Sequence, residues 1–396
     1  MKKVLLTNFN IVNFSGSEID TISIANYFYN NGYQVDIFTL EKGYPLLKII
    51  NKKIRVIVPS EKDKLLKRYD IIWSHHFPLL DYVLFALNIR SKHIFYISLS
   101  SFEPYEALPE YCNDLSLIGA ISDEVKCKLV DEGCNKDKIM LFPNYATAEY
   151  FNCKFKINNK VKRICIVSNH VPEELVEFKV IAERNDIKVD IFGIQYTPKY
   201  IDSKLLSKYD VIISIGKTIY YAVAMGKCAY CYDLYGGYGY ITKDNIENAY
   251  SYNFSGRGFG KKKSSDVILK EILDNYNAVL LDLDFNKNFA YDNFNFEKNI
   301  KGITDIILDN NIDESKFYKK YSYLNRKSKL FVERLNVCCN KYYELLRDYL
   351  ELVDYKVMYE NEVLKYNEII NSTSWKITKP IRCFKNIFHK ILRRKR

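Results

Sequence analysis

Short apolar runs alternate with amphipathic segments from the start of the chain. The run KVLLT at 3–7 is followed by a segment with helical spacing over about 17–30, and then by the apolar run QVDIFTL at 34–40. Asn31 and Gly32 supply a common signal for the end of the intervening helix. Strands that alternate with helices in this way predict parallel sheets covered by helices on both faces.

The alternation occurs twice, with a polar stretch between the two series. The polar stretch covers 146–160, and the second series opens with RICIVS and continues through KVDIFG and VIISI. We therefore predict an α/β protein with two Rossmann-like domains, one at 1–150 and the other at 151–310, which are joined by a linker and face one another across a cleft.

The C-terminal part of the chain is helical and charged in pattern. Apolar or tyrosine residues recur at a spacing of three and then four between Tyr342 and Ile370. This heptad seam fits a homo-oligomeric coiled coil through 335–370, and a helix packed back on the domains would show the same stripe. We treat 311–372 as a helical segment and 373–396 as a tail.

Positive charge is concentrated in that tail. The chain carries a net charge of +11, and residues 374–396 hold nine Lys or Arg and no acidic residue, which leaves +2 for the remainder. A nearly neutral body argues against nucleic acid as a partner, because nucleic-acid-binding proteins carry basic residues across a folded face. An acidic partner is therefore expected at the tail.

The sequence favours a cytoplasmic location. The N-terminal apolar run is too brief for a signal peptide, and polar residues interrupt every later run well before about 18 residues. The ten cysteines are then expected as reduced thiols. Cys228 and Cys231 form a C-x-x-C, but no second pair of ligands lies at suitable spacing, so we expect no metal there.

Several loops at predicted strand ends are candidates for ligand contact. In FSGSEID, Ser15, Gly16 and Ser17 lie between a predicted strand and a predicted helix. These residues fit contact with either of two substrates, a group donor or a group acceptor, and they fit a plain turn equally well. The loop is not a P-loop, because it lacks the Gly-Lys-Ser/Thr ending.

The loop in SIGKTIYY is better suited to a diphosphate. Gly216 frees the backbone at a strand end, and Lys217 and Thr218 stand at the N-terminus of the next helix, where free amides and the helix dipole favour an anion. Further contacts with the ligand that carries this diphosphate are expected from glycines and an acidic residue at neighbouring strand ends. These residues are Gly193, Asp233, Gly236 and Gly237.

Two adjacent histidines end the strand DIIWSHHF. An imidazole titrates near pH 6.5, so His75 or His76 is a candidate general base for an acceptor hydroxyl, and Glu103 and Glu106 are lesser candidates. Structural histidines in a cleft wall would give the same sequence. Zinc is not expected, because adjacent residues in a strand point to opposite faces.

Four segments resemble the GT-B glycosyltransferases, especially the large family 4. FSGSEIDTISIANYFYNNGYQVDIFT is similar to that family's opening glycine loop, helix and second strand, and DIIWSHHFP to its strand ending in histidine. LIGAISDEVKCKLVDEGCNKDKIMLFPNYA resembles its segment with a serine-capped helix, with Tyr145 where a glycine is expected. DVIISIGKTIYYAVAMGKCAYCYDLYGGYGYIT resembles its donor site, with Tyr221 where a glutamate is expected to hold the donor.

The end of the chain carries a second resemblance. NSTSWKITKPIRCFKNIFHKILRRKR is similar to the S-x-SWR-x-T-x-PLR tail of many bacterial surface-polysaccharide glycosyltransferases. Its apolar residues recur at helical spacing among basic ones, so the tail is expected on an anionic membrane surface, although a solvated tail or nonspecific nucleic-acid contact fits the same charge. The residues expected at the membrane are Trp375, Lys376, Lys379, Arg382, Phe384 and Phe388.

Together the resemblances imply a glycosyltransferase at the inner face of a bacterial cell membrane. It would move a hexose from a nucleotide-diphosphate-sugar to a glycan acceptor, which we expect to be lipid-linked, in the synthesis of a surface polysaccharide. No cofactor is expected, and no D-x-D motif stands at a strand end to hold a metal. The alternative is an inactive scaffold of the same fold that tethers partner enzymes, whereas an NAD enzyme would need a G-x-G-x-x-G that FSGSEI lacks.

Overall fold

A computed structural model describes residues 1–193, 195–258, 261–335, 337–338, 341 and 345. The chain divides into two compact units, Met1–Val332 and Glu333–Arg396. Most of the predicted heptad segment and the whole of the basic tail, including its six predicted membrane contacts, lie outside the described residues. Within the described part of the chain, no helix combines the length and apolarity needed to cross a membrane.

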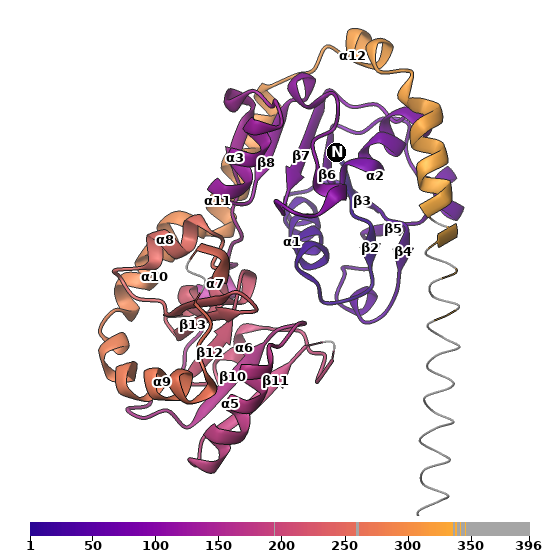
Figure 1. The fold of residues 1–396 in the computed structure, drawn as a ribbon. Coiled ribbons are helices and arrows are strands. Elements are labelled where there is room, and N and C mark those ends of the chain that lie inside the picture. The colour runs from indigo at the N-terminus through magenta and orange to yellow at the C-terminus, as the bar shows by residue number, and fades with distance from the viewer. Residues whose placement is uncertain (194, 259–260, 336, 339–340, 342–344, 346–396) are drawn as a thin grey trace, which may run out of the picture. The chain divides into compact units, whose positions relative to one another are not determined.

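The first domain is built on a seven-stranded parallel sheet in the order β5-β3-β1-β6-β7-β8-β9 (Figure 1). The chain runs outward from β1 in one direction and then outward from β6 in the other, so the strand order reverses between these two neighbours. The strands are β1 (Lys3–Thr7), β3 (Gln34–Phe38), β5 (Arg55–Ile57), β6 (Ile71–His75), β7 (His93–Ser98), β8 (Leu117–Ala120) and β9 (Ile139–Leu141). Two further short strands, β2 (Asn10–Ile11) and β4 (Glu41–Lys42), follow β1 and β3 along the chain and pair with each other.

The two helices that the sequence predicts in this domain, at about 17–30 and from Ser122 to near Gly133, begin and end close to the predicted positions. Helix α1 (Gly16–Asn30) ends at Asn31 and Gly32, and Gly32 has the positive φ of +80° that favours glycine. Helix α3 (Asp123–Asp131) is capped by Ser122, whose hydroxyl accepts the amide of Val125 at 3.3 Å. A short helix, α2 (Phe77–Asp81), follows β6.

The second domain holds a five-stranded sheet in the order β11-β10-β12-β13-β14. Its first four strands are parallel, and β14 pairs with β13 in the antiparallel sense. The strands are β10 (Arg163–Val167), β11 (Lys188–Phe192), β12 (Val211–Ser214), β13 (Cys228–Asp233) and β14 (Gly236–Tyr240). The helices are α5 (Glu173–Arg184), α6 (Ser203–Leu206), α7 (Lys217–Met225), α8 (Ile246–Ser251), α9 (Ser265–Leu280) and α10 (Leu283–Phe294).

Two boundaries differ from the prediction. The stretch predicted as a linker contains α4 (Ala148–Phe151), whose Tyr150 and Phe151 are buried in the core that includes α7. Helix α11 (Phe296–Asp309) was assigned by sequence to the second domain, but Ile300 and Ile303 are buried in the core of the first sheet. The chain therefore returns to the first domain at about residue 295, because the apolar face of α11 is covered there and not on the second sheet.

The helical segment predicted from residue 311 also begins by packing on the first domain. Helix α12 (Glu314–Lys320) places Phe317 against Phe85, with ring centroids 6.1 Å apart. The hydroxyl of Tyr318 accepts the amide of Ser91 at 3.1 Å, and the Arg90 guanidinium lies 3.8 Å from the Tyr318 ring centre. The start of this segment is thus part of the first compact unit.

Replacing Ile303 with alanine should destabilise the first domain by about 2–5 kcal/mol, because a fully buried side chain would leave a cavity in the core of the first sheet. The exposed neighbour Lys301 provides the matched control, since Lys301→Ala should change stability by less than about 0.5 kcal/mol. Chemical denaturation would measure both. Equal midpoints for the two variants would contradict the placement of α11 in this core.

Candidate functional site

A cavity of about 510 Å³ lies at the carboxyl edge of the second sheet. Its walls come from the residues that follow β10, β11, β12 and β13, and from the loop that precedes α1 of the first domain. The strand order of the second sheet reverses between β10 and β12, and open α/β sheets bind ligands at such a reversal. The sequence-predicted residues that line it are Ser15, Gly16, Gly193, Lys217, Thr218, Tyr221 and Asp233.

Gly193 is required by a close approach of two backbones. A Cβ atom at this position would lie 1.9 Å from the carbonyl oxygen of Ser168, which follows the neighbouring strand β10. The obstructing atom belongs to the backbone of Ser168, so no change of side-chain rotamer could make room for a Cβ atom at Gly193. Gly193 and Ser168 both line the cavity, and Gly193 presents its backbone there without a side chain.

The N-terminus of α7 opens onto the same cavity. Gly216 precedes the helix with φ of +52°, a conformation that favours glycine, and Lys217 and Thr218 form its first turn. Both residues line the cavity. The positive end of the helix dipole therefore points where the sequence predicts a diphosphate.

The Lys217 ammonium is already paired with a carboxylate of the first domain. Its Nζ donates to Oδ1 of Asp20 in α1 at 3.1 Å and lies 4.4 Å from the ring centre of Tyr145. The other carboxylate oxygen of Asp20 lies 3.0 Å from Nε2 of His75. Burial opposes the ionisation of Asp20, but Lys217 and His75 outweigh it and hold its pKa well below the usual range. Asp20 is thus a buried anion with two partners.

The predicted catalytic histidines do not line the cavity. His75 is fully buried at the end of β6 and is held by Asp20. His76 leaves the strand with φ of +63°, and its Nδ1 accepts the amide of Phe9 at 3.2 Å. Burial, followed by the nearby charge of His75, lowers the pKa of His76 to about 3, so its imidazole is neutral at physiological pH.

Glu106 lies beside His76, with Oε1 3.8 Å from Nε2 of that ring. It stands in the short 3₁₀ helix η4 (Pro104–Glu106) and accepts the amide of Leu99. Burial raises the pKa of Glu106 to about 7. Glu103, the other acidic residue predicted as a lesser candidate, is exposed at the start of η4, and neither glutamate lines the cavity.

Tyr221 occupies the position where the resemblance expects a donor-binding glutamate. Its ring stacks on that of Tyr150 in α4, with centroids 4.0 Å apart and planes 7° apart. The hydroxyl of Tyr150 donates in turn to the carbonyl of Ile201 at 2.7 Å. Tyr221 is therefore a buried part of the second-domain core whose edge reaches the cavity.

The glycines after β13 have a different role from the predicted one. Gly236 and Gly237 were expected in a loop open to the ligand, but they begin strand β14 and do not line the cavity. A Cβ atom at Gly237 would lie 2.0 Å from the carbonyl oxygen of Cys231, so close strand pairing requires this glycine. Asp233 lines the cavity as predicted, with Oδ1 accepting the amide of Tyr235 at 2.7 Å.

Several cavity residues were missed by the sequence analysis. The ring of Phe14 from the first domain lies 5.6 Å from that of Tyr200 in the second, so an aromatic pair bridges the cavity. Arg257, in the 3₁₀ turn η7 (Gly256–Gly258), contributes a guanidinium. The glycines on each side of Arg257 are the one sequence signal that marked this turn. Other missed residues are Asn13, Asn169, His170 and Lys199.

The loop that carries the first-domain wall is held by a buried carboxylate. Oε2 of Glu18 accepts the amides of Val12 at 3.1 Å and Asn13 at 2.6 Å. Burial raises the pKa of Glu18 to about 7 despite these two hydrogen bonds. The position of this wall therefore depends on a group that titrates near neutral pH.

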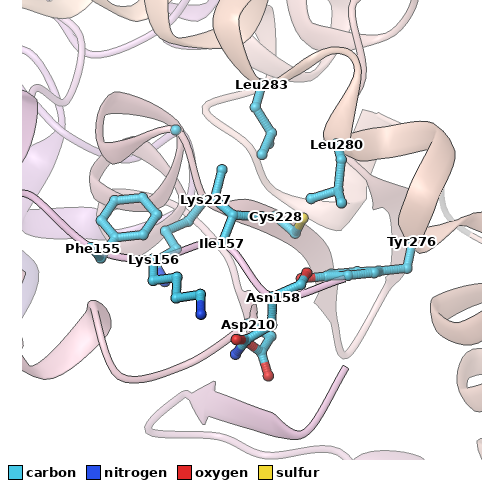
Figure 2. Close-up of a pocket in the computed structure, with 11 residues that line it drawn as sticks. Phe155, Lys156, Ile157, Asn158, Asp210, Lys227, Cys228, Tyr276, Leu280 and Leu283 are labelled. Carbon is cyan, nitrogen blue, oxygen red and sulfur yellow. The ribbon is translucent and has the colours of Figure 1, made fainter. Parts of the chain in front are cut away.

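A second pocket, of only about 10 Å³, lies around Lys227 and Cys228 (Figure 2). Lys227 Nζ donates to the carbonyls of Ser207 at 3.1 Å and Tyr209 at 2.7 Å, and burial lowers its pKa to about 8. A space of that size holds about one water, so Lys227 is a structural lysine that satisfies backbone carbonyls. Cys228 and Cys231 pack in separate cores on the two faces of the sheet and do not come together.

The described part of the chain contains no group of three or more His, Cys, Asp or Glu side chains placed to hold a metal ion.

The two sheets, which are parallel apart from β14, their helices and the cavity at a strand-order reversal define the two-domain GT-B fold. Neither a protein-family model nor a curated protein matches this sequence. Among solved structures, Anabaena HepE in complex with UDP and glucose matches with a TM-score of 0.54 and 12% identity, over 78% of this chain and 100% of HepE. HepE in complex with UDP-glucose gives a TM-score of 0.53 at 12% identity and the same coverage. Acinetobacter baumannii MurG gives a TM-score of 0.47 at 13% identity, over 78% of this chain and 100% of MurG.

The ionisation of Glu18 should make stability fall with rising pH. Its pKa is about 7 in the folded protein and near 4.5 when exposed, so the native state binds the extra proton between these values and loses stability as pH rises from about 4.5 to 7. Glu18→Gln keeps an acceptor for both amides without the charge. Between pH 5 and pH 8, the free energy of unfolding of the variant should therefore rise relative to that of the native protein by up to about 3 kcal/mol.

Thermal melts of both proteins across this pH range would measure the gain. Other titrating groups, such as Glu106, affect the two proteins equally and cancel in the comparison. A constant difference between Glu18→Gln and the native protein at every pH would show that Glu18 does not titrate in this window.

Proposed function

We propose that the protein is a glycosyltransferase whose nucleotide-sugar donor binds in the 510 Å³ cavity. The observation that carries this proposal is the convergence on one cavity of Gly193, Lys217 and Thr218, which follow the carboxyl ends of β11 and β12, the two parallel strands on either side of β10. Such a site offers close backbone contact, a helix N-terminus and a cation, and these are the features that a diphosphate requires. HepE, which has the same fold, binds UDP with glucose and UDP-glucose in its crystals.

The chemistry follows from charge on the leaving group. As the bond from the sugar to the diphosphate breaks, negative charge builds on the phosphate oxygens, and fixed positive groups stabilise it more in the transition state than in the ground state. Lys217 and the first amides of α7 are placed to supply this field. We propose that transfer proceeds without a metal ion, and that the remaining lining residues select the base and sugar.

The acceptor side is proposed to use the cluster of His76 and Glu106. Because Nδ1 of His76 accepts the Phe9 amide, its proton resides on Nε2 and that nitrogen cannot accept another. Glu106, with a pKa of about 7, is better suited to take a proton from a hydroxyl at neutral pH. We therefore assign His76 a positioning role beside Glu106, and His75 the role of holding Asp20.

An inactive scaffold remains the second candidate. Tyr221 stacked in the core, in place of a donor-binding glutamate, is the observation that favours it. The two candidates differ in nucleotide binding, because a scaffold has no need of a working diphosphate site.

Lys217→Ala should weaken binding of a nucleoside diphosphate by at least about tenfold, since one charged contact to phosphate is lost. Calorimetric titration of the full chain with UDP, GDP, ADP and dTDP, each with and without EDTA, would identify the donor base and test the proposed independence from metal. Because Lys217→Ala leaves the buried Asp20 carboxylate without its lysine partner, the double variant Asp20→Asn with Lys217→Ala should be measured as well.

The exposed Lys208, outside the cavity, is the matched control, and Lys208→Ala should bind as the native protein does. A native chain that binds none of the four nucleotides would overturn the donor site and favour the scaffold. An affinity that depends on EDTA would overturn only the metal-free mechanism.

We further propose that the acceptor is lipid-linked and that the basic tail brings the protein to an anionic membrane. Each basic residue near such a surface contributes about 1 kcal/mol. The triple variant Lys376→Gln, Lys379→Gln and Arg382→Gln should therefore lose about a hundredfold in affinity for vesicles of phosphatidylcholine with phosphatidylserine, measured by co-sedimentation. Vesicles of phosphatidylcholine alone are the control, and equal binding to both kinds of vesicle would contradict an electrostatic contact.

A further inference from the structure

Two cations that line the cavity are each paired with a carboxylate of the other domain. Lys217 at the start of α7 is bound to Asp20 in α1, and Arg257 in η7 is bound to Glu124 in α3. Both cations belong to the second domain and both carboxylates to the first. Of the residues that the structure describes, Lys199 is the third lysine or arginine in the lining, and it is exposed.

Arg257 and Glu124 form a bidentate ion pair, in which two guanidinium nitrogens each donate to one carboxylate oxygen. Nε of Arg257 donates to Oε1 of Glu124 at 3.2 Å, and Nη2 donates to Oε2 at 2.8 Å. A fork of two parallel N–H groups fits a phosphate as well as a carboxylate. The side chains are 29% and 21% exposed, so the pair is partly hydrated and can exchange partners at a smaller cost than a fully buried pair.

The turn that carries Arg257 is fixed at the edge of the cavity. The amide of Gly256 donates to Oδ2 of Asp233 at 3.1 Å, and Asp233 itself lines the cavity. A Cβ atom at Gly256 would lie 2.2 Å from the carbonyl oxygen of Gly236, so the turn is packed tightly against the start of β14. The backbone therefore holds Arg257 in place, and only its side chain needs to move to meet a ligand.

We propose that Arg257 is a second diphosphate-binding residue and that Glu124 occupies its guanidinium until a ligand arrives. This inference rests on the proposed function. A nucleoside diphosphate carries more negative charge than Lys217 can balance, particularly while Asp20 shares that ammonium. Arg257 is the further cation that the structure holds in a defined position at the cavity. Phosphate binding then replaces an ion pair between the two domains with a contact to the ligand.

Glu124 acts in this scheme as a competitor of the phosphate. Its Oε1 also accepts the hydroxyl of Ser101 at 3.3 Å, and this hydrogen bond remains when Arg257 leaves. Removing the Glu124 charge should therefore tighten the binding of a diphosphate, whereas removing the Arg257 charge should weaken it. Neither change should affect a nucleoside without phosphate, because both act on the diphosphate alone.

Calorimetric titration of the full chain would test this with UDP, GDP, ADP and dTDP, their nucleosides, and inorganic pyrophosphate. Arg257→Gln should weaken binding of the preferred nucleoside diphosphate and of pyrophosphate by roughly tenfold to a hundredfold. Arg257→Lys should recover part of that loss. Glu124→Gln should tighten binding severalfold, but only while Arg257 is present, so the double variant should match Arg257→Gln alone.

The control is Arg184→Gln, which removes an exposed arginine at the end of α5, outside the cavity. If Arg257→Gln binds diphosphates as tightly as the native protein while Lys217→Ala does not, the role of Arg257 is wrong and the proposed donor site stands. If the native chain binds neither a nucleoside diphosphate nor pyrophosphate, both the inference and the proposed donor site are wrong. Equal weakening of nucleoside and diphosphate by Arg257→Gln would indicate a structural role and overturn the assignment.

Discussion

The carboxylate of Asp20 is buried where α1 of the first domain meets α7 of the second, and a buried anion is stable only when it is paired. Its two oxygens are satisfied by Lys217 on one side and His75 on the other. This single group therefore fixes the end of β6, the face of α1 and the start of α7 relative to one another. The cavity is formed between elements that this interaction holds together.

Aromatic side chains support the same ion pair. The ring of Tyr145 faces the Lys217 ammonium and packs at a tilt of 31° against the ring of Phe296 in α11, with centroids 4.2 Å apart. The helix that returns from the second domain to the first thus supports the site from below.

The protonation state of the site is set by burial more than by local charge. Glu18 holds the first-domain wall, Glu106 lies beside His76, and burial brings the pKa of each carboxyl to about 7. His76 responds in the opposite direction, because burial disfavours the charged form of an imidazole as well. Burial therefore shifts the pKa of the two carboxyls and that of the imidazole in opposite directions.

The sequence alone determined the order of strands and helices, since periodicity and capping residues such as Ser122 and Gly32 act locally. It also predicted a ligand site at Gly193, Lys217, Thr218 and Asp233, and these residues line one cavity because the carboxyl ends of parallel strands meet at one edge. Only the tertiary structure decided which carboxylates reach the cations, since Asp20 lies 197 residues from Lys217 and Glu124 lies 133 from Arg257. It also decided that the glycines after β13 pair as a strand and that α11 returns to the first sheet. Those outcomes depend on which surfaces are covered across the fold, and no local pattern encodes that.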